Sequence, residues 1–401
     1  MSGSQSSREQ SGADPPHPRE DREDLAADTL DGGTAIGLSA ARDPGESTGR
    51  ATFEPDEIRR VLAAYPLGEI TGIQAFEAGS RLAPKLRISS SRGEYLLKRR
   101  VARPELVRRA VFNHGLQLHL EQSGLPVARL VGTAKENRSM LLENERVYEV
   151  FDWIEGRRPV RAGPEVLNSG RILGRLHIAG ASFRPVEPSD LAGFHAATSV
   201  DLAFERTEAA ICAADPSASA SETRALVHRL RKRLREASAR VEDAGWTELP
   251  RQPIHGDWHP GNVLFTPAPP TARHPGVVRA IVDFDASRLE PRIVDLANGL
   301  LHFAMRSTRD RTPDAWPASL SPTRIRAMIS GWKEGVGTPL PGESRSLAPL
   351  MVEALIAESI VPIAREGTFA GVPGLPFLTM VEEKARWIDS RTEALAALID
   401  G

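Results

Sequence analysis

Three polar side chains in the second half of the chain are spaced so that they could act together. Asp257 and Asn262 lie five residues apart in the segment IHGDWHPGNVLF, and Asp283 follows Asn262 by 21 residues, in AIVDFD. Both segments contain short apolar runs typical of strands, so the ends of one hairpin would bring two carboxylates and one carboxamide together. Phosphoryl transfer needs this combination, because metal ligands offset the charge of the phosphates while a carboxylate orients the attacking hydroxyl.

A lysine in the first half of the chain could supply a cation to the same site. The chain has only six lysines, and Lys98 lies in the strand-like segment EYLLKRRV. Alternation along a strand places Leu96 and Lys98 on one face, with Leu97 and Arg99 on the other. A lysine that reaches a cleft from such a strand can contact nucleotide phosphates.

Two regions of different character must position these residues. Residues 51–155 form a small β-rich region, with helices predicted at 52–65 and 104–124 and strands at 70–78, 84–90, 94–101, 139–143 and 146–154. Residues 156–401 are helix-rich, with helices predicted at 164–180, 221–243, 322–335, 346–365 and 379–399. Only 262–265 and 277–285 read as strands there, joined by a Pro-rich surface turn. The pattern predicts an α+β fold with a boundary near Gly156.

Composition narrows the classes of protein to which the chain of 401 residues could belong. Residues 1–50 have ten acidic side chains, five arginines and no aromatic residue, so we expect a disordered acidic tail. The remainder is nearly balanced in charge, which argues against a nucleic-acid partner. No stretch approaches the roughly 18 apolar residues of a membrane span, so no membrane partner is expected. Cys212 is the only cysteine, which excludes an intramolecular disulfide, and we expect a cytoplasmic protein.

The segment HGDWHPGN together with IVDFD resembles the catalytic core of the aminoglycoside phosphotransferase-like kinases. That group includes choline kinases, type II homoserine kinases and a stress-response protein kinase. YEVFDWIEGR resembles the hinge of the family, and LGRLH resembles its first large-lobe helix. The resemblance extends from about Phe53 to the final helices, and it is most specific over Ile254–Leu300. It implies a protein-kinase-like fold, with an antiparallel β-rich N-lobe at 51–155 and a helical C-lobe at 156–401.

The resemblance also implies roles for individual residues. Asp257 matches the catalytic aspartate that accepts the proton of the acceptor hydroxyl, Asn262 matches a ligand of a second Mg²⁺, and Asp283 matches the aspartate that binds the Mg²⁺ bridging the nucleotide phosphates. Lys98 matches the lysine that holds the α- and β-phosphates of ATP. Main-chain groups near Phe151–Ile154, including those of Phe151 and Trp153, would receive adenine. Asp295 matches a buried aspartate that braces the catalytic loop.

Other assignments have two interpretations. His255 could be a general base, although the family motif favours support of the loop backbone. His259 could contact phosphate or cap a turn, and Asp285 could assist a metal ion or be a solvated acid at a strand end. Gly79 and Ser80 could begin a phosphate-covering loop or form a simple turn.

The sequence departs from the family pattern in two places. A glutamate partner for Lys98 should lie in the middle of the helix at 104–124, yet no acid occurs between Val111 and Leu120. Either another carboxylate pairs with this lysine, or a neutral group holds it. Only nine residues separate Asp285 from Asp295, too few for a phosphorylated activation segment. A small-molecule acceptor is therefore favoured over a protein.

The leading hypothesis is an ATP- and Mg²⁺-dependent phosphotransferase, with two ions, that acts on a hydroxyl of a small molecule. The alternatives are a type II homoserine kinase, a stress-response-type serine/threonine protein kinase and a non-catalytic nucleotide-binding pseudokinase. Residues 301–401 hold twelve acids against eleven basic residues, so no acidic excess marks a site for a polycationic aminoglycoside.

Overall fold

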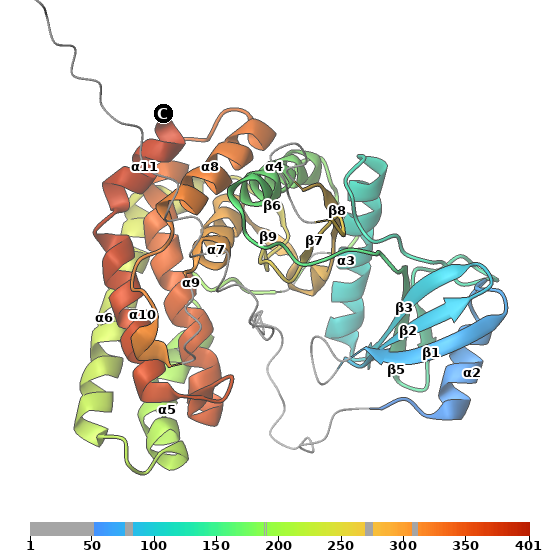
Figure 1. The fold of residues 1–401 in the computed structure, drawn as a ribbon, viewed down its shortest axis with the longest axis horizontal. Coiled ribbons are helices and arrows are strands. Elements are labelled where there is room, and N and C mark those ends of the chain that lie inside the picture. Colours follow the sequence, from blue (N-terminus) through green and yellow to red (C-terminus); the bar gives the residue numbers. More distant parts are fainter. Residues whose placement is uncertain (1–51, 77–82, 188, 190, 269–275, 307–311) are drawn as a thin grey trace, which may run out of the picture.

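The chain folds into a β-rich lobe and a helical lobe (Figure 1). The computed structural model describes residues 52–76, 83–187, 189, 191–268, 276–306 and 312–401. The predicted tail at 1–50, the pair Gly79–Ser80 and most of the Pro-rich turn lie outside the described residues. The mixed architecture confirms the predicted α+β class.

The small lobe is built on a five-stranded antiparallel sheet with the order β1-β2-β3-β5-β4. Its strands match the predicted ones closely: β1 (Ile70–Phe76), β2 (Lys85–Ser90), β3 (Gly93–Val101), β4 (Leu141–Glu143) and β5 (Arg146–Asp152). Alternation on β3 sends Tyr95 and Leu97 into an apolar core with Ile88 and Val150. The opposite face of β3, which carries Lys98, is left for contacts with the other lobe.

Two helices flank this sheet. Helix α2 (Pro55–Ala63) lies on the side away from the helical lobe, and α3 (Pro104–Gln122) lies on the side facing it (Figure 1). Glu57 of α2 receives the buried guanidinium of Arg99 at 2.8 Å, which confirms that Arg99 points away from Lys98. Helix α3 also contacts the turn Phe284–Ala286 (η2), so it spans the junction between the lobes.

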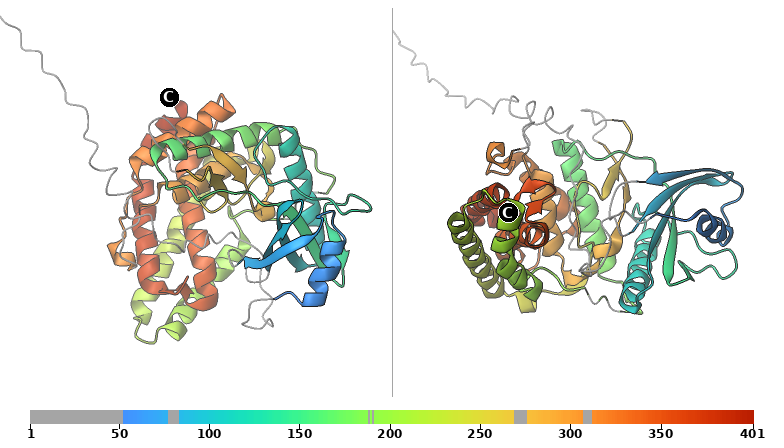
Figure 2. Two further views of the ribbon diagram at one scale, coloured as in Figure 1. Left: turned by 45° about the vertical axis from the view of Figure 1, so that its right-hand side comes forward. Right: turned by 90° about the horizontal axis from the view of Figure 1, so that it is seen from below.

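The larger lobe contains eight helices among the described residues: α4 (Gly163–Gly180), α5 (Thr198–Ala214), α6 (Ala220–Asp243), α7 (Ile293–Ala304), α8 (Pro322–Val336), α9 (Glu343–Glu366), α10 (Gly374–Asp389) and α11 (Thr392–Asp400). Helices α5, α6, α9 and α10 stay on the side away from the sheet in both views of Figure 2. Helix α5 was not predicted. The single helix predicted at 379–399 is wrong, because α10 ends at Asp389 and α11 begins at Thr392.

Two small sheets hold the loops between α6 and α7. Strand β6 (Arg251–Ile254) pairs with β9 (Arg288–Pro291), and β7 (Val263–Phe265) pairs with β8 (Val278–Ile281). The prediction of only two strands in residues 156–401 is wrong, because the short pair β10 (Thr368–Phe369) and β11 (Val372–Pro373) was missed, and so were β6 and β9. Strands β6 and β9 are short and contain proline, which is depleted in strands, and neither has an apolar run. The predicted strand 277–285 ends early, because η2 replaces its last residues.

Helix α9 is the one described helix that is long and apolar enough to cross a membrane by length and composition, which the sequence interpretation did not expect. Of its most apolar window, 78% is buried inside the protein. A helix that is apolar on all sides is typical of a protein core as well as of a membrane span. In this fold α9 is packed against α5, α6, α7, α10 and α11.

Candidate active site

Asp257 and Asn262 lie together on the loop between β6 and β7. The Nδ2 atom of Asn262 donates to Asp257 Oδ2 at 3.0 Å and to the Asp257 carbonyl oxygen at 3.1 Å. His259 Nε2 lies 3.4 Å from the same carboxylate. Burial would raise the pKa of Asp257, but the hydrogen bond and charge of His259 outweigh it and lower the pKa. The carboxylate is therefore ionised and held in a fixed orientation at neutral pH.

Asp295 at the start of α7 fixes the backbone of this loop. Its carboxylate accepts hydrogen bonds from the amides of His255 and Gly256, both at 2.7 Å, and lies 3.2 Å from His177 Nε2. Gly256 has a φ of 79°, a conformation that a side chain would strain. The imidazole of His255 is fully buried, with Nε2 3.1 Å from the Val282 carbonyl oxygen, and burial lowers its pKa. These contacts support the predicted bracing roles of His255 and Asp295.

Replacing Asp295 should therefore destabilise the fold. Asp295→Asn leaves a single acceptor oxygen for two buried amides, and we expect a loss of about 3 kcal/mol in the free energy of unfolding. Denaturant unfolding measures this change. Asp243→Asn at the exposed end of α6 is the matched control, for which a change within about 0.5 kcal/mol is expected. Equal effects of the two substitutions would contradict the bracing role.

Asp283 lies where the β7–β8 hairpin meets the small lobe. The amide of Val282 donates to the carbonyl oxygen of Asn262 at 3.0 Å, so Asp283 and Asn262 occupy the same end of the hairpin. Asp283 has a φ of 63° and a ψ of 68°, a left-handed conformation that few residues other than glycine adopt. Such backbone outliers occur often at functional sites, where the surrounding structure maintains them.

Lysines from two strands of the small lobe reach this carboxylate. Lys98 Nζ lies 3.3 Å from Asp283 Oδ1 and 2.5 Å from Asp285 Oδ2, and Lys85 Nζ lies 3.4 Å from Asp283 Oδ2. Burial would raise the pKa of Asp283, but the ammonium groups of Lys98 and Lys85 lower it instead. The structure thus brings Lys98 of the small lobe next to Asp283 and Asp285 of the helical lobe, and the roles of these residues in binding nucleotide and metal stay predictions.

The structure shows which carboxylates pair with Lys98 in the absence of a glutamate in the middle of α3. Lys98 pairs with Asp283 and Asp285, and the acid that contacts the middle of α3 is Glu149 of β5, the Cα partner of Lys98 in the sheet. Glu149 is buried and lies 2.6 Å from His114 Nε2 on α3, while Arg100 Nε donates to it at 2.8 Å. The sequence interpretation missed Glu149 and Arg100. A charged residue inside the apolar strand 146–152 was the available signal.

The two predicted hinge residues, Phe151 and Trp153, pack against different parts of the small lobe. The amide of Trp153 donates to the Glu94 carbonyl oxygen at 2.9 Å, so this hinge amide is engaged within the small lobe. The Trp153 ring contacts Phe76 edge-on, and the Arg87 guanidinium lies over it at 4.6 Å. Phe151 contacts the His114 ring. These contacts show packing of both side chains, and their role in nucleotide binding stays a prediction.

A polar cluster adjoins Asp257 on the side of the helical lobe. The rings of His259 and His302 lie 5.8 Å apart, and His302 Nε2 lies 3.1 Å from Glu358 Oε2. Asn298 donates to Glu358 Oε1 at 3.2 Å, and its own Oδ1 is buried without a partner in the described structure. Burial would lower the pKa of His302, but Glu358 and Asp257 raise it. None of His302, Glu358 and Asn298 was predicted from the sequence.

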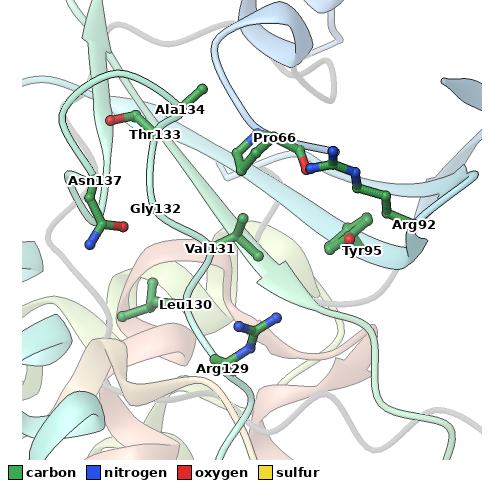
Figure 3. Close-up of a pocket in the computed structure, with 10 residues that line it drawn as sticks. All are labelled: Pro66, Arg92, Tyr95, Arg129, Leu130, Val131, Gly132, Thr133, Ala134 and Asn137. Atoms are coloured by element: carbon green, nitrogen blue, oxygen red, sulfur yellow. The ribbon is translucent and has the colours of Figure 1, made fainter. Parts of the chain in front are cut away.

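A cavity of about 780 Å³ lies in the small lobe, and Figure 3 shows the residues that line it. It is lined by residues 129–134, Pro66, Arg92, Tyr95 and Asn137. Its two arginines are already engaged, because Arg92 donates to the Pro66 carbonyl oxygen and Arg129 pairs with Asp152. None of the site residues described above lines it.

Comparisons with solved structures reveal the same fold in several kinases. An aminoglycoside phosphotransferase from Alicyclobacillus acidocaldarius is 18% identical with a TM-score of 0.58, covering 88% of this chain and 98% of its own. A microcompartment-associated aminopropanol kinase is 13% identical with a TM-score of 0.59, over 86% and 99% of the two chains. An amicoumacin kinase, solved in complex with AMP-PNP, Ca²⁺ and Ami, is 11% identical with a TM-score of 0.56, over 85% and 94% of the two chains.

Comparisons at the level of sequence identify the family of the chain. No curated protein sequence matches the chain significantly. A family profile does match, over residues 72–332, and this range contains the hinge, the β6–β9 region, α4 to α7 and most of α8. The match covers well over half of the chain and includes Lys98, Asp257, Asn262 and Asp283. The chain is therefore a phosphotransferase and belongs to the APH phosphotransferase enzyme family.

Proposed function

We propose that the protein transfers the γ-phosphate of ATP to a hydroxyl group of a small molecule in the cytoplasm, with Mg²⁺ as cofactor. The observation that carries this proposal is the convergence of two pairs of side chains on one hairpin end. Asp257 is hydrogen-bonded to Asn262 at 3.0 Å, and Asp283 receives Lys98 from the other lobe at 3.3 Å. The AMP-PNP in the related amicoumacin kinase structure supports a nucleotide as donor.

The side chains of the site suit Mg²⁺ as its metal. Asn262 uses its Nδ2 to hold Asp257, which leaves its Oδ1 as a hard oxygen donor at the same end of the hairpin as Asp283. Among the described residues, no group of three or more His, Cys, Asp or Glu is arranged to hold a metal ion. Mg²⁺ prefers few protein oxygens and takes its remaining ligands from substrate phosphates and water. Asn262, Asp283 and Asp285 would hold the metal, which offsets phosphate charge during transfer.

Each of these residues would have a separate role in phosphoryl transfer. Ionised Asp257 accepts a hydrogen bond from the acceptor hydroxyl, orients its oxygen for in-line attack and takes its proton. Asn262 and His259 keep this carboxylate in place. Lys98 holds the phosphates that leave with the nucleotide. Because Asp295 fixes the backbone of the loop that carries Asp257, this carboxylate would need little reorganisation when the reaction occurs.

The segment after Asp285 favours a small acceptor over a protein. Arg288–Pro291 forms β9 and pairs with β6, and Arg288 and Glu290 are buried and joined at 2.6 Å. This segment is therefore part of the lobe and does not offer an exposed strand for a protein substrate. The acceptor would instead enter beside Asp257, where it meets His302 and Glu358.

Glu358→Gln should weaken binding of the acceptor without affecting the nucleotide. The substitution removes a charge that the His302 imidazole and the Asn298 amide contact, so we expect the acceptor KM to rise about tenfold while the KM for ATP stays constant. Glu358 raises the pKa of His302, so its loss should lower that pKa toward the ordinary value. Steady-state kinetics and an NMR titration of His302 measure the two effects.

Glu236→Gln on the exposed face of α6 is the control for this prediction. It should leave both KM values and the pKa of His302 unchanged. An unchanged acceptor KM in Glu358→Gln would remove Glu358 from the acceptor site.

The proposed function is tested in two steps. Mg²⁺ and ATP together should raise the melting temperature of the protein, whereas ATP with EDTA should not. Labelled γ-phosphate should then pass to one member of a panel of amino-acid alcohols, amino alcohols, sugars, aminoglycosides and a generic protein. Labelling of the protein alone would favour the stress-response type of kinase, and labelling of homoserine alone would identify a homoserine kinase. Tight ATP binding without transfer to any acceptor would favour a pseudokinase.

A further inference from the structure

A guanidinium lies next to Lys98 on the same face of β3. Arg100 is two residues further along the strand, so alternation points both side chains toward the helical lobe. Arg100 donates through Nε to Glu149 Oε2 at 2.8 Å and through a terminal nitrogen to Asp285 Oδ1 at 2.9 Å. Its side chain is 13% exposed. The guanidinium therefore bridges the small lobe and the carboxylate beside Asp283.

Glu149 holds this guanidinium and is itself fixed from the helix. Its side chain is 1% exposed, and Oε1 lies 2.6 Å from His114 Nε2 in the middle of α3. His114 Nδ1 in turn lies 2.9 Å from the hydroxyl of Ser139. Burial would raise the pKa of Glu149, but Arg100 and His114 lower it, so the carboxylate stays charged. Helix α3 thus reaches the cleft through His114 and Glu149, where an ordinary helix glutamate would contact the lysine directly.

The charges in this cluster indicate a polyanion as the ligand. Lys85, Lys98 and Arg100 bring three positive charges to Asp283 and Asp285. Burial would lower the pKa of Arg100, but Asp285 and Glu149 raise it, so the guanidinium is always charged. A metal ion bound by Asp283 and Asp285 would neutralise part of their negative charge. Lys85, Lys98 and Arg100 would then carry an excess of positive charge that attracts a further anion. Arginine is well suited to phosphate oxygens, because its planar donors can form two parallel hydrogen bonds.

We propose that Arg100 is a second phosphate-binding residue beside Lys98, and that Glu149, tied to α3 by His114, is its positioning residue. The ligand is the polyphosphate tail of the nucleotide, so the inference rests on the proposed function. It also explains the absence of an acid between Val111 and Leu120. The carboxylate that positions the cation comes from β5, and it positions Arg100 instead of Lys98.

Calorimetric titration with Mg·ATP and with adenosine, without any acceptor, tests the role of Arg100. Arg100→Met should weaken ATP binding about tenfold and leave the affinity for adenosine unchanged, because only ATP carries the phosphate tail. Arg146→Met, on the exposed end of β5, is the matched control and should bind both ligands like the wild type. Equal weakening of ATP and adenosine, or no change in either, would overturn the proposal.

If the Arg100→Met variant does not fold, the Arg100→Lys variant provides the same test. It keeps the charge and loses the planar donors, so the affinity for ATP should fall several-fold and that for adenosine should not change. An unchanged ratio of the two affinities in this variant would overturn the proposal. If the wild-type protein binds neither ligand, the proposed function fails first, and this failure is distinguishable from a failure of Arg100 alone.

A double-mutant cycle tests the positioning role of Glu149. Glu149→Gln should weaken ATP binding in the wild-type background and have no effect when Arg100 is already Met, because it acts through that residue. A purely structural glutamate would reduce ATP binding equally in both backgrounds. That result would contradict the positioning role.

Discussion

Asp257→Asn is expected to reduce turnover on the order of 10³-fold while leaving the affinity for Mg·ATP nearly unchanged. The substitution keeps the size of the side chain and the hydrogen bond from Asn262 can still form to the remaining oxygen. It removes the negative charge that would receive the proton of the acceptor hydroxyl. The contacts of Lys98 lie on Asp283 and Asp285, so the cation assigned to the phosphates is untouched.

Rapid-quench measurement of a single turnover separates chemistry from product release in this experiment. The pH dependence provides a second check, because the pKa of Asp257 is lowered in the folded protein. A carboxylate with a lowered pKa is active above that pKa and is protonated only at lower pH. The acid limb of kcat/KM should therefore lie below about pH 4, the ordinary pKa of aspartate. Near-normal turnover in Asp257→Asn would contradict the proposed base.

Asp283→Asn should reduce kcat/KM by about 10²-fold or more and should also weaken Mg·ATP binding. Asparagine tolerates the left-handed backbone at this position, so the effect would come from charge and not from backbone strain. The substitution leaves Lys98 and Lys85 with one carboxylate fewer between them. It also removes one of the hard ligands proposed for the metal.

The two aspartate variants are expected to differ in binding as well as in turnover. Calorimetry with ATP in Mg²⁺ and in EDTA should show a loss of metal-dependent affinity in Asp283→Asn and none in Asp257→Asn. Asp56→Asn on the exposed surface of α2 is the control and should match the wild type in both measurements. Retention of full Mg²⁺-dependent affinity in Asp283→Asn would remove this residue from the metal site.

Local patterns and the family motif were sufficient to predict the elements that carry the candidate site residues within one stretch of sequence. The loop from His255 to Asn262, the β7–β8 hairpin and the strand that carries Lys98 are each encoded by residues a few positions apart. Alternation on β3 also predicted that Arg99 and Lys98 point to opposite faces, which the Arg99–Glu57 pair confirms. Periodicity is a local property, so it identifies such elements well.

Contacts between distant elements were not predictable in the same way. Glu149 becomes the partner of Arg100 and His114 only because β5 lies beside β3 and α3 crosses behind them. The strands β6 and β9 pair with one another next to the loop that carries Asp257, although neither has a strand-like pattern alone. His302 and Glu358 are 56 residues apart and meet only when α7 packs against α9. Their roles depend on tertiary packing, which residue spacing does not encode.

The most direct test of the central claim compares phosphate transfer by the wild type and by Asp257→Asn. Both proteins are incubated with Mg²⁺, γ-labelled ATP and the pooled acceptors, and the products are separated by chromatography. The account predicts a labelled phosphate ester of one small molecule with the wild type and almost none with the variant, which should still bind ATP. Equal labelling by the two proteins would contradict the assignment of Asp257 and, with it, the proposed mechanism.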